Sequence, residues 1–327
     1  MIADPPTQVA IVTGFLGAGK TTLIARLLRE PNMAGTAVIV NEFGEVGLDH
    51  ELLASSTESV VALPNGCLCC MVRTDLVQAL LELDAQRSVP GRSFDRVLVE
   101  TSGLADPAPI LHALMTDPAL AGRFAIAAVT TVVDTGLGAA TLARHPEARR
   151  QVAFADRLLL AKRDLYAPDE ALLAALTGLN ATAPVGDARE GAAALFAAHR
   201  HDAPVPVVAA HTGDVRAITV LRDRPVPAVA LTLFLQALAE HCGARLLRLK
   251  GLVDLAETPG RPAVVHGVQH VFAPVDWLET WPSADRRSRI VLIGEGIPTY
   301  FPARLLEAIV AELPELTGDI AFGITAS

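Results

Sequence analysis

The sequence predicts an α/β protein: a P-loop NTPase domain with a mostly parallel sheet, followed by a smaller α+β C-terminal domain. Three observations lead to this prediction. A glycine-rich loop that ends in Gly-Lys-Thr, at residues 14–21, joins a short apolar run to an amphipathic stretch. Four further short apolar runs are continuous rather than alternating, as in strands that are buried on both faces. Beyond about residue 195 this regular pattern of runs stops.

The strands expected in the first domain each end at a polar motif. They cover residues 9–13, 36–40, 96–99, 125–133 and 157–160, with helices over 23–29, 74–83, 109–115 and 168–176. Strands that alternate with helices indicate a parallel sheet. Because open parallel sheets bind ligands beyond the carboxyl ends of their strands, we expect the polar motifs to form one site.

The second domain is expected to be a small α+β unit with a split βαβ arrangement. Strands are predicted over residues 217–221, 244–254, 263–271 and 289–293, and helices over 229–241 and 303–313. The predicted boundaries are 1–198 for the P-loop domain, 199–215 for a linker that contains Pro and His, and 216–327 for the C-terminal domain.

The composition predicts a folded, cytoplasmic protein. Apolar residues make up 51% and charged residues 19% of the 327 positions, which excludes disordered and fibrous proteins. The net charge is −9, from 36 acidic and 27 basic residues without a basic stripe, which argues against nucleic acid as a partner. No basic leader begins the chain, and no uncharged apolar stretch reaches ~18 residues, so neither a signal peptide nor a membrane segment is expected.

The first motif is a phosphate-binding loop, in which Gly14 and Gly19 frame four residues before Lys20 and Thr21. Glycines let backbone N–H groups curl around phosphate oxygens, and the following helix N-terminus favours negative charge. We expect Lys20 to contact the β- and γ-phosphates and the Thr21 hydroxyl to bind Mg²⁺.

A second motif, Ala161-Lys162-Arg163-Asp164, follows the fifth predicted strand. In P-loop GTPases an Asn-Lys-x-Asp motif at such a strand end reads guanine, through the carboxylate and the stem of the lysine. Here Ala161 stands where the asparagine would brace the loop, so we expect weakened guanine affinity. Lysine is scarce, with three among 27 basic residues, which favours a specific role for Lys162 over a solvated, charged strand end.

A third motif, Glu100-Thr101-Ser102-Gly103, follows the third predicted strand. A P-loop enzyme carries there its Walker B acid and a glycine that senses the γ-phosphate. We expect Glu100 to act on Mg²⁺ through water or to position the attacking water, and the Gly103 N–H to sense the γ-phosphate. Residues 104–109 would then form a switch segment. The alternative is an ordinary strand-terminal acid.

Three of the four cysteines lie within four positions, at Cys67, Cys69 and Cys70. A disulfide within so short a motif would be strained, and thiols near a helix start have lowered pKa values, so thiolate binding of a soft metal ion is favoured. Three sulfurs leave one tetrahedral position open, which suits an ion that is passed on. A structural metal site, a redox pair and inert thiols are the alternatives.

The motifs GFLGAGKTT, NEFGEVGLDH, GCLCC and ETSGLADP, in this order and spacing, resemble those of the CobW-like metallochaperone GTPases. These belong to the same P-loop group as the nickel-delivery GTPases of urease and hydrogenase. The resemblance is strong over about residues 8–165 and weaker at 248–251 and 267–272. It implies a GTPase that binds Zn²⁺ or Co²⁺ at the cysteines and passes the ion to a client metalloenzyme.

The resemblance also implies roles for individual residues. Phosphate and Mg²⁺ would be bound by Gly17, Ala18, Gly19, Lys20, Thr21 and Thr22, guanine by Lys162 and Asp164, and the metal ion by Cys67, Cys69 and Cys70. Glu42, Glu45 and Asp49 lie in the switch I segment, where their carboxylates could support Mg²⁺ or the transferred metal.

The motifs together predict a switch. GTP with Mg²⁺ would hold residues 41–50 and 100–109 in one arrangement, and hydrolysis would change the geometry of the thiolates. Hydrolysis is expected to be slow, because the motifs position no catalytic arginine; a homodimer or the client could supply what is missing. Two alternatives stay open: a P-loop kinase with a structural zinc site, and a non-catalytic metal-binding adaptor.

Overall fold

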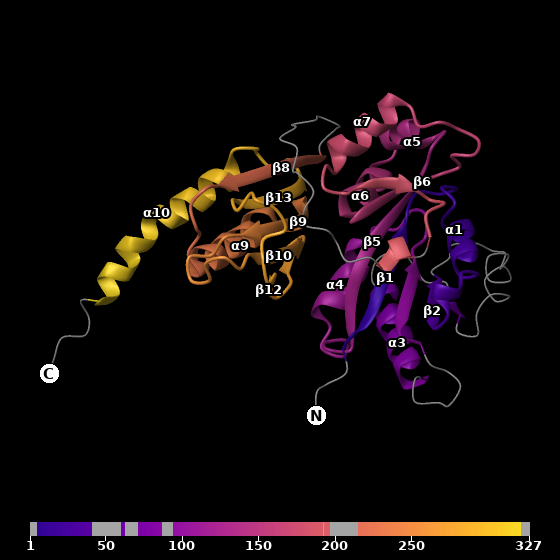
Figure 1. Ribbon diagram of the computed structural model, residues 1–327, viewed down its shortest axis with the longest axis horizontal. Helices are drawn as coiled ribbons and strands as arrows, with labels where there is room; N and C mark the ends of the chain where they lie inside the picture. Colours follow the sequence, from indigo (N-terminus) through magenta and orange to yellow (C-terminus); the bar gives the residue numbers. More distant parts are fainter. Residues whose placement is uncertain are drawn as a thin grey trace. The chain divides into compact units, whose positions relative to one another are not determined.

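The computed structural model of the chain describes residues 5–40, 60–62, 71–86, 94–191, 193–196 and 215–321. The chain divides into two compact units, Met1–Arg200 and His201–Ser327 (Figure 1). The predicted linker over 199–215 lies outside the described residues except for Val215, so its bounds stay a prediction. Within the described ranges, no helix has both the length and the apolar character needed to cross a membrane.

A parallel sheet forms the centre of the first unit, and its described part has seven strands. They are β1 (Thr7–Thr13), β2 (Thr36–Val40), β3 (Val60–Ala62), β4 (Arg96–Glu100), β5 (Phe124–Asp134), β6 (Arg157–Ala161) and β7 (Val185–Asp187), in the spatial order β3-β2-β4-β1-β5-β6-β7. Neighbouring strands in this order run parallel. The expected fold class is confirmed.

Helices cover both faces of this sheet (Figure 1). The first unit contains α1 (Lys20–Leu27), the 3-10 turn η1 (Pro31–Met33), α3 (Met71–Gln86), α4 (Ala108–Thr116), α5 (Gly138–Arg144), α6 (Pro146–Phe154), α7 (Glu170–Leu179) and α8 (Ala193–Phe196). On one face, Leu23 and Ile24 of α1 pack with Val12 of β1. The side chains of Val9 and Ile11 in β1 point to the opposite face from Val12, because successive side chains of a strand alternate between faces. Both are also fully buried, so this second face is covered as well.

Six described elements of the first unit are absent from the sequence prediction: β3, β7, α5, α6, α8 and η1. The two strands have three residues each, which is too short for a periodic signal. Helices α5 and α6 are short and follow one another directly, so neither offers a long amphipathic window. Pro146 at the start of α6 is a local sign of a helix N-terminus.

The second unit is built on an antiparallel sheet. The described strands are β8 (Val215–Arg222), β9 (Leu246–Val253), β10 (Ala263–Val268), β11 (Val271–Phe272), β12 (Asp276–Trp277) and β13 (Ser288–Glu295), in the order β11-β10-β9-β13-β8 with β12 beside β10. Strand β13 lies between β8 and β9 and is antiparallel to both. Strands β8 and β9 therefore run parallel and, with α9 (Ala228–Cys242), form the expected split βαβ unit.

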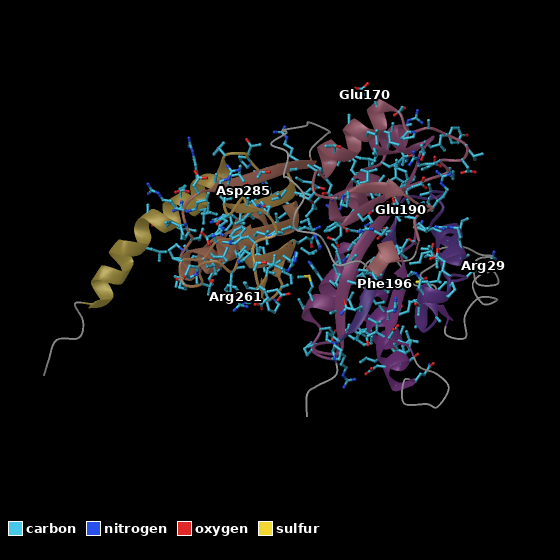
Figure 2. All side chains as sticks on the ribbon, viewed as in Figure 1. Arg29, Glu170, Glu190, Phe196, Arg261 and Asp285 are labelled. Atoms are coloured by element: carbon cyan, nitrogen blue, oxygen red, sulfur yellow. The ribbon has the colours of Figure 1, made fainter. Side chains whose placement is uncertain are left out.

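The core of the second unit lies between this sheet and two helices, α9 and α10 (Phe301–Ala321); the 3-10 turn η2 (Gly243–Arg245) leads from α9 into β9. Phe234 and Leu238 of α9 pack with Ile290 of β13. Cys242 belongs to the same core, and burial raises the pKa of its thiol. Arg29, Glu170 and Arg261 are examples of charged side chains that are exposed on the outside of the units (Figure 2).

Candidate nucleotide-binding site

The polar motifs of the first unit follow β4, β1, β5 and β6, which are neighbours in the sheet. Because parallel strands bring their carboxyl ends to one edge, the segments after these strands lie along the same edge. Strand β7 ends beside β6 at this edge too. The edge therefore gathers five segments that are far apart in the sequence.

The phosphate loop between β1 and α1 has a backbone that only its glycines permit. Gly14, Gly17 and Gly19 have φ values of 144°, 72° and 98°, which side chains rarely allow. A Cβ on Gly14 would lie 2.3 Å from the carbonyl oxygen of Val132 in β5. The loop thus rests directly against the neighbouring strand.

Four side chains at the end of the phosphate loop and the start of α1 have different environments. The Nζ of Lys20 donates to the Gly14 carbonyl oxygen at 3.0 Å, so the lysine is folded back over the loop, and it is buried. Ala18 is buried, whereas Thr22 is exposed on α1. The Thr21 hydroxyl is directed at the end of β4.

Thr21 joins the phosphate loop to the end of β4. Its Oγ1 donates to Oε1 of Glu100 at 2.8 Å, and Glu100 is buried. Strands β1 and β4 are also joined at their ends, where Oγ1 of Thr101 donates to Oγ1 of Thr13 at 2.7 Å. Hydroxyl and carboxylate oxygens are the ligands that Mg²⁺ prefers. The pair Thr21 and Glu100 therefore fits a magnesium ion beside the phosphate loop.

Gly103 lies against the phosphate loop and is held there by α6. A Cβ on Gly103 would come within 2.7 Å of the backbone of Leu16. The Nε2 of Gln151 donates to the carbonyl oxygens of Gly103 and Ala105, both at 3.1 Å, and Gln151 is 1% exposed. Sequence reasoning missed Gln151 because it missed α6.

Lys162 follows β6 with a left-handed backbone, at φ 61°. Its Nζ donates to Oδ2 of Asp134 at 2.6 Å. Burial acts to raise the pKa of Asp134, but hydrogen bonds from Lys162 and from the backbone N–H groups of Leu137 and Gly136 outweigh it, so the pKa lies below its usual range. Asp134 was visible in the sequence only as the polar end of an apolar run.

A cavity of about 260 Å³ lies between the phosphate loop, the end of β5 and the helices α5 and α6. Its walls include the loop residues 15–18, Asp134, Gln151 and Lys162. Asp164, predicted to read the base beside Lys162, is exposed in the turn after β6 and does not line this cavity.

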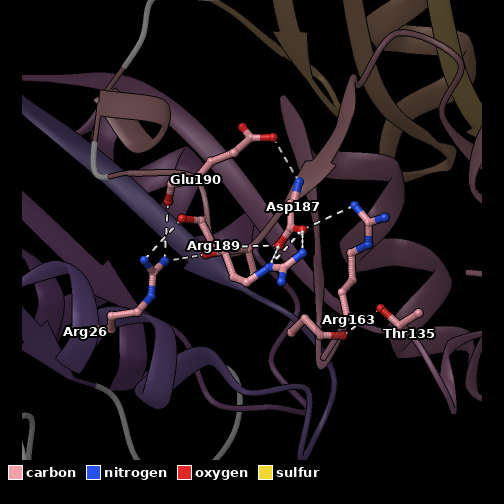
Figure 3. A network of polar contacts seen from close by, with 8 residues as sticks. Arg26, Thr135, Arg163, Asp187, Arg189 and Glu190 are labelled. Atoms are coloured by element: carbon pink, nitrogen blue, oxygen red, sulfur yellow. Dashed lines mark hydrogen bonds and ion pairs between the residues drawn. The ribbon is translucent and has the colours of Figure 1, made fainter. Parts of the chain in front are cut away.

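The loop after β7 is tied to α1 by a polar network that sequence reasoning also missed (Figure 3). Arg26 of α1 donates to the carbonyl oxygens of Ala188, Arg189 and Glu190. Hydrogen bonding from Arg189, together with its charge and that of Arg163, lowers the pKa of Asp187 to about 2. The loop is thereby fixed at the same sheet edge as the phosphate loop.

The predicted metal ligands and switch I residues lie outside the described residues: Cys67, Cys69, Cys70, Glu42, Glu45 and Asp49. Strands β2 and β3 end just before them, with Val40 paired to Glu100 and to Ala62. Both chain segments therefore start from the edge that carries the phosphate loop. Elsewhere in the described chain, no group of three or more His, Cys, Asp or Glu is arranged to hold a metal ion.

Comparison with known proteins agrees with this architecture. Residues 8–186 match the family described as CobW/HypB/UreG, nucleotide-binding domain, and residues 215–310 match the cobalamin synthesis protein cobW C-terminal domain. The zinc chaperone YjiA of Escherichia coli is 33% identical, over 90% of this chain and 95% of that protein. The zinc chaperone CobW of Pseudomonas aeruginosa is 32% identical, over 93% and 91% respectively.

A solved structure extends the likeness to three dimensions. The crystal structure of Zn(II)-bound YjiA GTPase from E. coli has a TM-score of 0.69 to this chain at 27% identity, and the match covers 93% of this chain and 99% of that one. Both the sequence and the fold thus agree across the two units. The chain belongs to the CobW/HypB/UreG family and combines its nucleotide-binding domain with a CobW C-terminal domain.

Proposed function

We propose that this protein is a GTP-hydrolysing metallochaperone, which binds Zn²⁺ or Co²⁺ at Cys67, Cys69 and Cys70 and delivers it to a client metalloenzyme. The observation that carries the proposal is the hydrogen bond between Thr21 and Glu100, which joins the phosphate loop to the end of β4. The two side chains lie beside the loop and would bind Mg²⁺ there. The relatives named as zinc chaperones support metal delivery as the purpose of hydrolysis.

Each described residue would have a definite part in nucleotide binding. Backbone N–H groups of residues 17–22 would hold the phosphates, and Lys20 would move from the Gly14 carbonyl to the β- and γ-phosphates. Thr21 would bind Mg²⁺ directly, and Glu100 would bind it through water or position the attacking water. Mg²⁺, when bound, neutralises charge that develops on the phosphate oxygens.

Gly103 and the residues after it would report the nucleotide state. The Gly103 N–H lies in a segment that touches Leu16 of the phosphate loop, which supports a role for it in sensing the γ-phosphate. Lys162 and Asp164 would read guanine at the other end of the site. Hydrolysis by the chain alone would be slow, and a second copy or the client would complete the site.

The arrangement of the strands supports coupling between nucleotide and metal. Segment 41–59 begins at the end of β2, and the cysteines follow β3. Strand β2 pairs with β4, which carries Glu100. A change at the γ-phosphate would be passed from β4 through β2 to β3, the strand that precedes the cysteines in the sequence. The nucleotide and metal affinities would then influence each other reciprocally.

Product analysis tests the enzymatic part of this proposal. With GTP and Mg²⁺ we expect free phosphate, and we expect Lys20→Ala to lower its production by about 10²-fold or more, because the charge on the transferred phosphate loses its partner. The matched control is Arg29→Ala, an exposed basic residue just beyond α1. A phosphorylated acceptor in place of free phosphate would indicate the kinase instead. A Lys20→Ala variant with intact metal delivery would indicate the adaptor.

A further inference from the structure

We infer that the end of β5 and the turn after it, residues Asp134, Thr135 and Gly136, hold the loop 161–166 in the conformation that reads guanine and so set nucleotide selectivity. We name the three residues the clamp and residues 161–166 the base loop. This inference rests on the proposed function, since it assumes that Lys162 and Asp164 of the base loop read guanine.

The first contact of the clamp orients the lysine. Oδ1 of Asp134 accepts hydrogen bonds from the backbone N–H groups of Gly136 at 2.8 Å and Leu137 at 2.9 Å. This leaves Oδ2 directed at Lys162, whose Nζ it meets at 2.6 Å. Asp134 is only 9% exposed. Burial and the two backbone hydrogen bonds together hold its carboxylate in one orientation. The direction of the Lys162 side chain is thereby determined.

The second contact holds the backbone just before that lysine. Thr135 donates to the Ala161 carbonyl oxygen twice, from Oγ1 at 2.6 Å and from its backbone N–H at 3.1 Å. That carbonyl belongs to the peptide that precedes Lys162, whose φ of 61° is unfavourable for a residue with a side chain. Two donors on one carbonyl fix this peptide plane and so maintain the left-handed turn.

The third contact holds the far end of the base loop. Gly136 lies under the ring of Tyr166, and a Cβ on Gly136 would come within 2.7 Å of the ring. The backbone N–H groups of Leu165 and Tyr166 both donate to the Lys162 carbonyl oxygen at 3.0 Å. The clamp therefore contacts both ends of a loop that is already closed on itself.

The identity of residue 161 explains why the clamp is needed. In the Asn-Lys-x-Asp motif an amide side chain braces the loop, whereas an alanine has neither a donor nor an acceptor to do so. Ala161 is paired with Asp134 across the parallel strands β5 and β6. The residues that can replace the missing brace are therefore those that follow Asp134 at the end of β5.

The test compares GTP and ATP affinities of the full chain by competition binding, because both nucleotides share the phosphate loop and differ in the base. For Asp134→Asn and Thr135→Val we expect GTP affinity to fall at least tenfold and ATP affinity to stay unchanged. The matched controls are Asp84→Asn, which removes an exposed ion pair with Arg123 at 3.1 Å, and Thr116→Val, which removes a hydroxyl bond to the His112 carbonyl at 2.8 Å. Both should keep the wild-type GTP-to-ATP ratio.

A rescue variant separates loop orientation from general damage. In the Thr135→Val background, Ala161→Asn should restore the GTP-to-ATP ratio, because the amide replaces the lost brace. Equal losses for GTP and ATP, an unchanged ratio in the clamp variants, or no rescue would overturn the inference. A wild-type chain that binds GTP and ATP equally would instead overturn the proposed guanine specificity itself, and the clamp with it.

Discussion

Gly14 shows how closely single residues determine the phosphate loop. Its φ of 144° and the Val132 carbonyl oxygen, 2.3 Å from any added Cβ, leave no room for a side chain. We predict that Gly14→Ala lowers the free energy of unfolding by about 3 kcal/mol or more, since backbone strain and a clash with a strand add together. Urea unfolding followed by circular dichroism measures the loss.

Gly122→Ala is the matched control for this prediction. Gly122 also has a positive φ, at 73°, but nothing lies within 4 Å of a Cβ placed there. Only the conformational cost of about 1–2 kcal/mol is expected. If the two variants lose the same stability, close approach to β5 is not the reason for glycine at position 14.

At the scale of single residues, the sequence predicts the members of motifs better than their partners. Lys20, Thr21 and Lys162 were recognisable because short motifs combine them with glycines or carboxylates at fixed spacing. Asp134 and Gln151 were not, because their contacts join positions 28 and 48 residues apart. Such contacts depend on which strands become neighbours, and that order is not encoded in any local pattern.

Helix α6 acts as the support for the segment that follows β4. Gln151 supplies two hydrogen bonds to the carbonyl oxygens of Gly103 and Ala105, and Arg150 pairs with Asp106 at 2.8 Å. We predict that Gln151→Leu lowers the free energy of unfolding by about 2–3 kcal/mol, because it leaves two carbonyl groups without their donor. GTP hydrolysis should slow as well, and steady-state phosphate release measures it.

Gln78→Leu provides the comparison on another helix. Gln78 is exposed on α3, and its side chain donates to Glu82 one turn further on, at 3.0 Å. Its replacement should change the free energy of unfolding by no more than about 0.5 kcal/mol and leave hydrolysis unaltered. A Gln151→Leu variant that hydrolyses GTP at the wild-type rate would show that α6 does not support the segment.

At the scale of elements, long buried strands were predictable and short ones were not. Strands β1, β2, β4, β5 and β6 each form a continuous apolar run, which between turn residues is typical of a strand covered on both faces. Strands β3 and β7 complete the two sides of the sheet with three residues each. Their pairing with β2 and β6 comes from the fold as a whole rather than from local propensity.

We expect nucleotide state and metal affinity to be coupled in this protein. The described part of the first unit brings phosphate loop, Glu100 and Gly103 together at one sheet edge, and β2 and β3 end at this edge. The cysteines follow β3 in the sequence. Coupling between the two sites must be reciprocal if it exists.

The most direct test measures the Zn²⁺ affinity of the full chain by competition titration in three states. These are the chain with GTP and Mg²⁺ bound, the chain with GDP and Mg²⁺ bound, and the chain without nucleotide. We predict a change of tenfold or more between nucleotide states, about 1.4 kcal/mol of coupling. Cys67→Ser should abolish this change, whereas Cys242→Ser, in the core of the second unit, should retain it. Equal Zn²⁺ affinities in all three states would contradict coupling between the nucleotide and the metal ion.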